Sequence, residues 1–322
     1  MSEKILTISI AAYNVEKYLP KTLESLVIPE IMDQLEVLII NDGSQDKTGQ
    51  IAEEYVVKYP ATFYLVNKEN GGWGSTVNTS AQLATGKYYK LLDGDDFFNA
   101  EALKKFVNEL ETVNTDLVFT QFTKVYEPEM NEELIEQKYP YYSVFPVSTI
   151  NAYSMHALTV KTEIIKSNEF HLLERCFYTD VEFCVRCFSL SESVLSLPIN
   201  VYQYRLGRDE QSVSIRSMMR RVQEHDKVVR EILPIVYNEK KLDNLKVDIN
   251  GLAARHLNLL LCVEPNEKHW KMFQDYADLL KEEYPEVIKS LLRYQRPLLR
   301  CNKCLYCFVV KRKRKKNKFD QV

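Results

Sequence analysis

Apolar segments of two kinds alternate over the first hundred residues. Short runs rich in β-branched and aromatic residues predict strands over residues 5–12, 35–40, 62–66 and 88–92. Apolar positions at helical spacing predict helices over residues 15–26, 47–59 and 75–84. Strands that alternate with helices of this length indicate βαβ units. The pattern therefore predicts an α/β fold with a mainly parallel, Rossmann-like sheet flanked by helices.

Polar residues stand where the predicted strands end. Asn14, Asp42, Asn67 and Asp93 follow or close the four strands in turn. In open parallel sheets the carboxyl ends of the strands meet at one edge, and ligands bind there. Seven of the nine glycines also fall within residues 43–94, which places backbone freedom where a phosphate-bearing ligand would approach.

The fourth strand leads into an acidic turn, Asp93-Gly94-Asp95-Asp96. Carboxylates this close repel one another unless a cation lies among them. Mg²⁺ and Mn²⁺ prefer oxygen ligands and keep positions open for phosphate oxygens. Gly94 is expected to let the backbone turn sharply, so that Asp95 faces a ligand. A solvated acidic turn is the alternative, because an isolated Asp-x-Asp is a weak signal.

Beyond the acidic turn, the spacing predicts a helix over residues 101–112 and strands over residues 117–123 and 156–160. The segment between those two strands, rich in Glu, Tyr and Pro, predicts an insertion or a strand pair. From residue 217 onward the pattern is helical, with helices over residues 218–236, 245–261 and 270–292. We expect an α/β domain over residues 1–216 with halves of about 1–100 and 101–216, a helical appendage over 217–297 and a tail over 298–322.

The tail combines an apolar stripe with a basic run. Cys301, Cys304 and Cys307 are spaced by three among apolar neighbours. Three thiols without a fourth ligand favour packing over structural zinc. The basic run over residues 311–318 is compatible with a solvated tail, with binding to nucleic acid or with binding to an anionic membrane surface. An apolar stripe beside a polybasic run favours the membrane.

Composition and charge narrow the class of protein to which the chain can belong. Of the 322 residues, 45% are apolar and 27% are charged, as in ordinary globular proteins. The formal net charge of −3 divides into −9 over residues 1–310 and +6 over residues 311–322, and an acidic body argues against nucleic acid. No apolar run reaches 18 residues, and no secretory leader is recognisable. Seven cysteines without a disulfide spacing favour a reducing, cytoplasmic setting.

Four segments together carry a family resemblance. They are residues 12–14, 40–46, 70–78 and 92–96. In order and spacing they resemble the family 2 inverting glycosyltransferases, closely over residues 4–100 and more weakly to about residue 215. The resemblance implies a GT-A fold, a nucleotide-sugar donor and a divalent metal, Mn²⁺ or Mg²⁺.

The resemblance also assigns roles to residues of the donor side. Its donor-binding positions are Ala12, Tyr13, Asn14, Asp42, Lys68, Gly71, Asn78, Asp93 and Arg208. The first three would line the nucleotide pocket, and the aspartate of the second segment would contact the base or the ribose. Of the Asp-x-Asp pair, Asp95 is the expected direct metal ligand and Asp93 the second.

Two departures from the family pattern bear on the diphosphate. Many members have proline where Ala12 stands and arginine where Val77 stands. Without that arginine, Lys68 and Lys90 are candidates to supply positive charge. Arg208 lies in residues 202–212, which we expect to form a loop and which resemble the loop closing over the donor, where a guanidinium would pair with diphosphate. A plain surface arginine is the alternative.

The acceptor side is expected at residues 177–183, which resemble the family's acidic motif opening a helix. Asp180 aligns with the residue that acts as the base. The alternative is that Thr179 or Asp180 only caps a helix over residues 181–189.

The resemblance thus implies a hexosyl- or N-acetylhexosaminyltransferase. We expect it to transfer a sugar to a hydroxyl of a polysaccharide or lipid-linked glycan acceptor. The expected donor is a uridine diphosphate sugar, and the expected location is the inner face of the cell membrane. A nucleotidyltransferase would usually carry a basic glycine-rich loop after the first strand. Residues 11–14, at that position, contain neither glycine nor a basic residue, which argues against this class of enzyme. The alternative is a non-catalytic sugar-nucleotide-binding or scaffold subunit of a polysaccharide synthase. The appendage could serve homo-oligomerisation, acceptor binding or membrane proximity.

Overall fold

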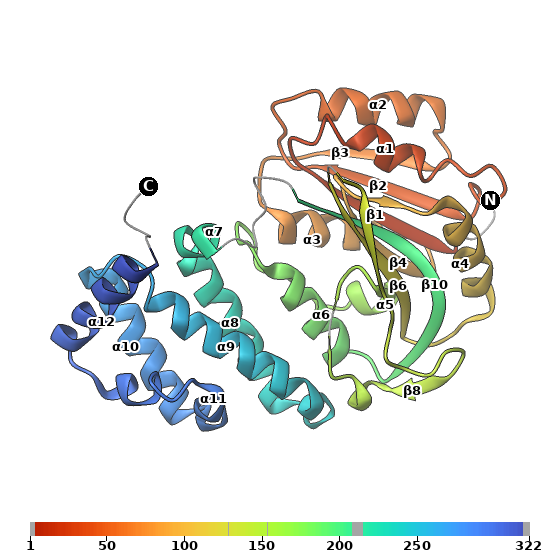
Figure 1. Cartoon of the computed structure of the whole chain (residues 1–322). Helices are drawn as coiled ribbons and strands as arrows, with labels where there is room; N and C mark the ends of the chain where they lie inside the picture. The colour runs from red at the N-terminus through yellow and green to blue at the C-terminus, as the bar shows by residue number, and fades with distance from the viewer. Residues whose placement is uncertain (1–3, 128, 153, 208–214, 318–322) are drawn as a thin grey trace. The chain divides into compact units, whose positions relative to one another are not determined.

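The chain forms two compact units, Met1–Asp209 and Glu210–Val322. The structure is a computed structural model, and it describes residues 4–127, 129–152, 154–207 and 215–317. Figure 1 shows the first unit built around a sheet and the second built from helices.

The sheet of the first unit runs in the order β3-β2-β1-β4-β9-β6-β10-β5, with β7 paired to β6 and β8 paired to β10. Its strands are β1 Leu6–Ala12, β2 Leu35–Asn41, β3 Phe63–Asn67, β4 Tyr88–Asp93, β5 Phe97–Phe98, β6 Leu117–Tyr126, β7 Asn131–Ile135, β8 Val144–Pro146, β9 Leu158–Lys161 and β10 Ser193–Leu206. The first four strands are mutually parallel, and β9 runs antiparallel to β4 and β6. The predicted α/β fold with a mainly parallel sheet is confirmed.

Helices cover both faces of this sheet. They are α1 Leu19–Glu24, α2 Thr48–Lys58, α3 Trp73–Leu83, α4 Ala100–Thr112, α5 Thr162–Ile165 and α6 Thr179–Ser189, with a 3₁₀ turn at Val147–Thr149. In Figure 1, α1 and α2 lie on one face of the β3-β2-β1 region and α3 lies on the other. Right-handed crossovers produce this arrangement, because the chain steps outward from β1 to β3 and then returns to β4. Every residue of β2 is buried, as expected of a parallel strand covered on both sides.

Three predicted elements differ from the structure. The first helix starts at Leu19 rather than near residue 15, because Pro20 favours the first helical turn. Residues 202–206 continue β10, whose ladder with β6 extends to Leu206, so this part of the predicted loop is strand. Between β6 and β9 the structure has strands, but β7 pairs with β6 and β8 pairs with β10 rather than with each other.

The second unit is helical, as expected. It contains α7 Ile215–Arg220, α8 Val222–Asn238, α9 Lys246–Leu260, α10 Glu267–Glu282, α11 Pro285–Ser290 and α12 Lys303–Lys316, with 3₁₀ turns at Lys240–Leu245 and Arg296–Arg300. None of the described helices has both the length and the apolar character needed to cross a bilayer. Cys301, Cys304 and Cys307 are free thiols, and among the described residues they join no group of metal-ligating side chains.

Candidate active site

The predicted polar residues meet at one edge of the sheet. The strand register sets Ala12 beside Asn41, Asn41 beside Asn67, and Ala11 beside Asp93. The carboxyl ends of β1, β2, β3 and β4 are therefore level. This edge is where ligands bind in open parallel sheets.

The residues after β1 present a tyrosine to solvent. Ala12 is buried, and its carbonyl accepts a hydrogen bond from the Asp42 N–H at 2.9 Å. Tyr13 is 51% exposed. Asn14 adopts a left-handed conformation with φ of 52°, and its side chain accepts a hydrogen bond from the Gln45 N–H at 2.8 Å. These contacts join the loops after β1 and β2 and leave the Tyr13 ring at the surface.

Asp42 organises the glycine-rich loop. Its Oδ1 accepts hydrogen bonds from Lys68 Nζ at 2.8 Å and from the Gly71 N–H at 2.9 Å. Its Oδ2 accepts one from the Gly72 N–H at 2.8 Å, and Gly72 has a φ of 81° that favours glycine. The structure thus brings Asp42, Lys68 and Gly71 together. An open depression of about 520 Å³ adjoins them, lined by Gly43, Gln45, Asn67, Lys68, Glu69 and Asn70.

The acidic turn depends on Gly94 for close approach rather than for a left-handed turn. A Cβ there would lie 2.9 Å from the Ala11 carbonyl oxygen, and the described glycines with positive φ do not include Gly94. Its N–H donates to the same carbonyl at 3.0 Å. Glycine is needed because the turn packs directly on the end of β1, which corrects the predicted reason for it.

The three carboxylates of the turn differ in exposure. Asp93 and Asp95 are half-buried, and Asp93 Oδ1 accepts a hydrogen bond from Trp73 Nε1 at 2.8 Å. Asp96 is fully buried and accepts hydrogen bonds from the Tyr202 hydroxyl at 2.7 Å and the Arg205 N–H at 2.8 Å. Burial, followed by the charges of Asp95 and Asp93, raises the pKa of Asp96 well above its ordinary value.

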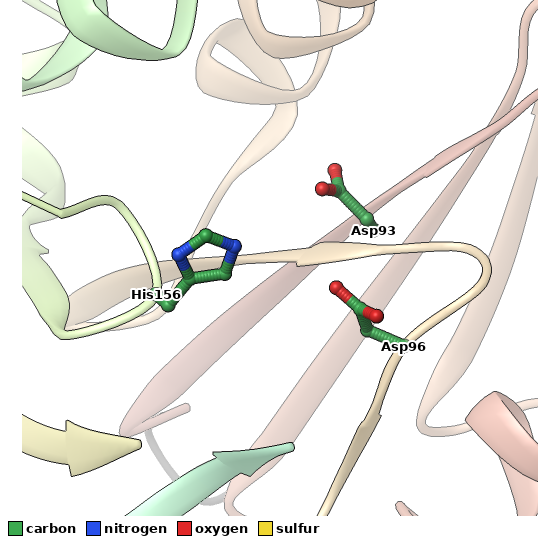
Figure 2. A group of neighbouring side chains, drawn as sticks. All are labelled: Asp93, Asp96 and His156. Carbon is green, nitrogen blue, oxygen red and sulfur yellow. The ribbon is translucent and has the colours of Figure 1, made fainter. Parts of the chain in front are cut away.

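A histidine joins this turn from a distant segment. Ligand atoms of Asp93, Asp96 and His156 all lie within 4.8 Å of one another, and Figure 2 shows the three side chains converging. Burial lowers the pKa of His156 to about 3, so the ring is neutral and keeps a nitrogen lone pair. Two carboxylates and a neutral imidazole suit a divalent ion such as Mn²⁺. This set shares Asp93 with the predicted pair but contains Asp96 and His156 rather than Asp95. No sequence pattern around residue 156 pointed to it.

Lys90 does not face the donor. It is fully buried, and its Nζ donates to the carbonyls of His156 at 3.0 Å and Leu158 at 3.2 Å. Burial lowers its pKa to about 7. The suggestion that Lys90 supplies charge to a diphosphate is therefore wrong, and the residue instead holds the segment that carries His156. Arg208 lies outside the described residues.

Asn78 connects the glycine-rich loop to the segment before α6. Its amide donates to the Leu172 carbonyl at 2.9 Å and accepts from the Leu172 N–H at 2.9 Å. Gly74 allows the same approach, since a Cβ there would lie 2.1 Å from the Leu173 carbonyl oxygen. In the structure Asn78 thus lies against this segment, which it fixes on α3. Buried Glu182 holds the segment too, through the Leu173 N–H at 3.1 Å and an ion pair with Arg186 at 2.9 Å.

Asp180 lies in the first turn of α6. The N-cap position belongs to Tyr178, with a φ of 69° and no side-chain capping bond, and Thr179 Oγ1 has no hydrogen-bond partner among the described residues. The structure thus gives neither Thr179 nor Asp180 the N-cap position that the alternative required. Asp180 is solvent-accessible, yet the protein atoms around its carboxyl raise its pKa, against the opposing effect of the Val181 and Asp180 N–H groups.

The Tyr204 ring stacks on that of His156, with 4.2 Å between their centres, beside the acidic turn. Burial, followed by the charges of Asp96, Asp93, Asp180 and Asp95, raises the pKa of Tyr204 to about 12. One phenol therefore lies within electrostatic range of all four carboxylates. The Trp73 ring lies between the acidic turn and α6, with its indole N–H donating to Asp93 and its centre 6.2 Å from the centre of the Phe183 ring of α6.

A mainly parallel sheet with an acidic turn after its fourth strand is the arrangement of a GT-A type glycosyltransferase. The model of the family "Glycosyl transferase family 2" matches residues 7–178, more than half of the chain. The chain belongs to this family.

Relatives and solved structures agree with that assignment. Uncharacterized glycosyltransferase EpsJ of Bacillus subtilis is 25% identical over 95% of this chain and 94% of its own length. The uncharacterized glycosyltransferase MG025 homolog of Mycoplasma pneumoniae is 45% identical over 104 residues, which span 31% of this chain and about a third of that relative (34%). The structure of S. aureus TarS 1-349 in complex with UDP-GlcNAc has a TM-score of 0.64 at 19% identity, covering 97% of this chain and 92% of that one.

Proposed function

We propose that the protein is an inverting, metal-dependent glycosyltransferase. It takes a hexosyl or N-acetylhexosaminyl group from a uridine diphosphate sugar and attaches it to a hydroxyl of a polysaccharide or lipid-linked glycan. The observation that carries the proposal is the acidic turn at the carboxyl end of β4, where Asp93, Asp96 and His156 converge in a chain of glycosyl transferase family 2. The charge of Asp180, on α6, raises the pKa of the same Tyr204 phenol as the charges of this turn do. Transfer requires such a pairing, because the nucleotide and the acceptor must be held side by side.

The donor half is assigned to the edge of β1, β2 and β4. The exposed ring of Tyr13 offers a surface on which a base can stack, and Asp42 holds the glycine-rich loop in place through the Gly71 and Gly72 N–H groups. Asp93 and Asp95 are half-buried, and Asp93, Asp96 and His156 form a set that could hold Mn²⁺ or Mg²⁺. When bound, such an ion would supply positive charge to the diphosphate as it departs.

Asp180 is assigned the role of general base. It removes the proton from the acceptor hydroxyl while that oxygen attacks the anomeric carbon from the face opposite the diphosphate. The bond from the anomeric carbon to the diphosphate oxygen breaks, its electron pair leaves with the diphosphate, and the configuration inverts. The raised pKa of Asp180 supports this role, since a base works best when its pKa lies nearer the working pH.

The relatives support the donor and the setting. TarS has been solved with UDP-GlcNAc and with UDP, and mannosyltransferase PcManGT of Pyrobaculum calidifontis with GDP-Man and Mn²⁺. A 97-residue region is 35% identical to the minor teichoic acid biosynthesis protein GgaB of Bacillus subtilis. We therefore place the enzyme in cell-envelope glycan synthesis, at the cytoplasmic face of the membrane.

The test is nucleotide release from a panel of UDP- and GDP-sugars by the purified full chain, with Mn²⁺ and with excess chelator. We expect turnover of a UDP-sugar that requires the metal and rises when a glycan or glycolipid acceptor is added. A donor that stabilises the protein thermally but is never turned over with any acceptor would favour the non-catalytic subunit. Turnover unaffected by chelator would remove the metal from the mechanism.

A further inference from the structure

Helix α12 is anchored in the helical unit by one side. Tyr306 and Val310 are fully buried, and the Tyr306 hydroxyl donates to the Leu260 carbonyl at 2.9 Å. The Tyr306 ring lies 5.0 Å from the Phe273 ring. The side chain of Asn302 caps the helix by accepting from the Leu305 N–H at 3.0 Å. The helix is therefore an ordered part of the unit and has a defined inner side.

The basic run of α12 divides between its two sides. Lys313 points inward, where Nζ donates to the Asn258 side chain and lies 5.9 Å from the centre of the Tyr294 ring. Arg314 also points inward, and its guanidinium donates to the Cys262 carbonyl at 2.9 Å. These two cations hold the helix onto α9 and the turn that follows it. The basic run is thus not uniformly solvated.

The opposite side carries a different set, which we call the outer face of α12. Its members recur every three or four residues, as positions on one helix face do: Leu305, Phe308, Lys311, Arg312, Lys315 and Lys316. The side chains of Leu305 and Phe308 are 45% and 61% exposed. The four basic residues are also exposed. Two apolar side chains in water thus adjoin four cations on the same surface.

We propose that the outer face of α12 docks on an anionic phospholipid surface. The first two turns would insert Leu305 and Phe308 at the boundary of headgroups and acyl chains, while the following turns place four cations among the headgroups. The inner side already buries Tyr306 and Val310, so the unit does not need the outer apolar pair to fold. This proposal sharpens the membrane location given above, but it does not depend on sugar transfer.

Charge favours a planar anionic surface over a polyanion that wraps the protein. Residues 1–310 carry a formal charge of −9 and residues 311–322 carry +6. An acidic body repels nucleic acid except at this one face. A bilayer contacts only the face presented to it. Its acyl chains can bury an exposed leucine and phenylalanine, which the phosphates and sugars of a nucleic acid cannot.

The test is co-sedimentation of the full chain with vesicles of phosphatidylcholine alone and with 30% phosphatidylglycerol. We expect binding to the anionic vesicles only, weakened steeply at high salt. Each cation near such a surface is worth about 1 kcal/mol, or about fivefold in partitioning, so changing Lys311, Arg312, Lys315 and Lys316 to Gln should lower partitioning on the order of 10²–10³-fold. Changing Leu305 and Phe308 to Ser should lower it by about tenfold or more.

A matched control removes the same charge elsewhere on the helical unit. Its four exposed lysines, changed to Gln, are Lys240, Lys268, Lys271 and Lys289. We expect less than about threefold loss, because charges not held at the surface contribute little. An equal loss in this control would overturn the outer face as the docking site. So would vesicle binding by the outer-face variants at the level of wild type, or binding of wild type to duplex DNA or RNA but not to vesicles. The rate of UDP release in an assay with a soluble acceptor should be the same in all variants as in wild type. This assay separates a failure of the membrane-docking proposal from a failure of the proposed enzyme activity.

Discussion

The sharpest test of the active site is the replacement of Asp180 by Asn. Asn keeps the size and polarity of the side chain and removes its ability to accept a proton. A positioned general base contributes about 10²–10⁴-fold, so we expect turnover to fall by that factor. Donor affinity should change little, because Asp180 lies on α6 while the donor half is built from β1, β2 and β4.

The stability of the variant adds an independent criterion. The folded state raises the pKa of Asp180, so it binds a proton more tightly than the unfolded state does. For such a carboxyl, stability falls as the pH rises from the unfolded pKa, near 3.8, through the raised folded value, and the penalty is fully present above it. Asn should therefore keep or raise the melting temperature at neutral pH. A residue whose role is to stabilise α6 would instead lower it.

The assay is nucleotide release at saturating donor and acceptor over a range of pH, with the melting temperature of each variant recorded. In wild type, activity should fall as the pH drops through the raised pKa of Asp180, and that limb should disappear in the variant. Glu53→Gln on α2 is the matched control, because it removes an exposed carboxylate from the same unit. A variant that retains most of its turnover at neutral pH would refute the assignment. Buried Glu182 would then be a poor substitute, since it is paired with Arg186.

Three further predictions test the remaining parts of the chain. Asp95→Asn should abolish transfer without lowering the melting temperature, since the residue is half-buried in a turn; turnover near wild type would argue against it. His156→Ala should lower the affinity for Mn²⁺, measured by quenching of Trp73 fluorescence, by about 10–100-fold, because a ligand of the Asp93 group is lost. An unchanged affinity would instead favour the Asp93–Asp95 pair as the metal site. In the helical unit, burial lowers the pKa of His225 to about 3, so the unfolded state binds the extra proton and stability should drop as the pH falls from 6.5 towards 3. His225→Phe should flatten that drop in urea titrations of the unit, and an unaltered drop would assign it to other groups.

Sequence reasoning succeeded where local pattern determines structure. The ends of β1 to β4 were predictable because β-rich runs stop at polar residues, and parallel pairing brings such ends together regardless of the rest of the chain. Asp42 and Asp93 were found in this way. Gly94 was identified as necessary but for the wrong reason, because the close packing of its backbone on Ala11 depends on a neighbouring strand.

Residues that depend on distant segments were not predictable. His156 reaches the acidic turn because β9 inserts antiparallel between β4 and β6, and no spacing in the sequence encodes that insertion. Lys90 lies in a run of strand type where its neighbours are buried, but its contacts with the carbonyls of His156 and Leu158 follow from the same insertion. Without β9 in place, a lysine on the fourth strand could equally have faced a phosphate.

The burial of Asp96 explains how three carboxylates can share one short turn. Two hydrogen bonds, from the Tyr202 hydroxyl and the Arg205 N–H, offset the cost of removing this carboxyl from water, and both donors belong to β10. Without a cation, its raised pKa favours the neutral form, which lessens the repulsion that Asp93 and Asp95 experience, whereas a bound cation would favour the ionised carboxylate. Asp96 thus ties the turn to β10, while the other two carboxylates remain partly exposed. The turn is therefore held in place before any cation binds, and binding need not supply the energy to order it.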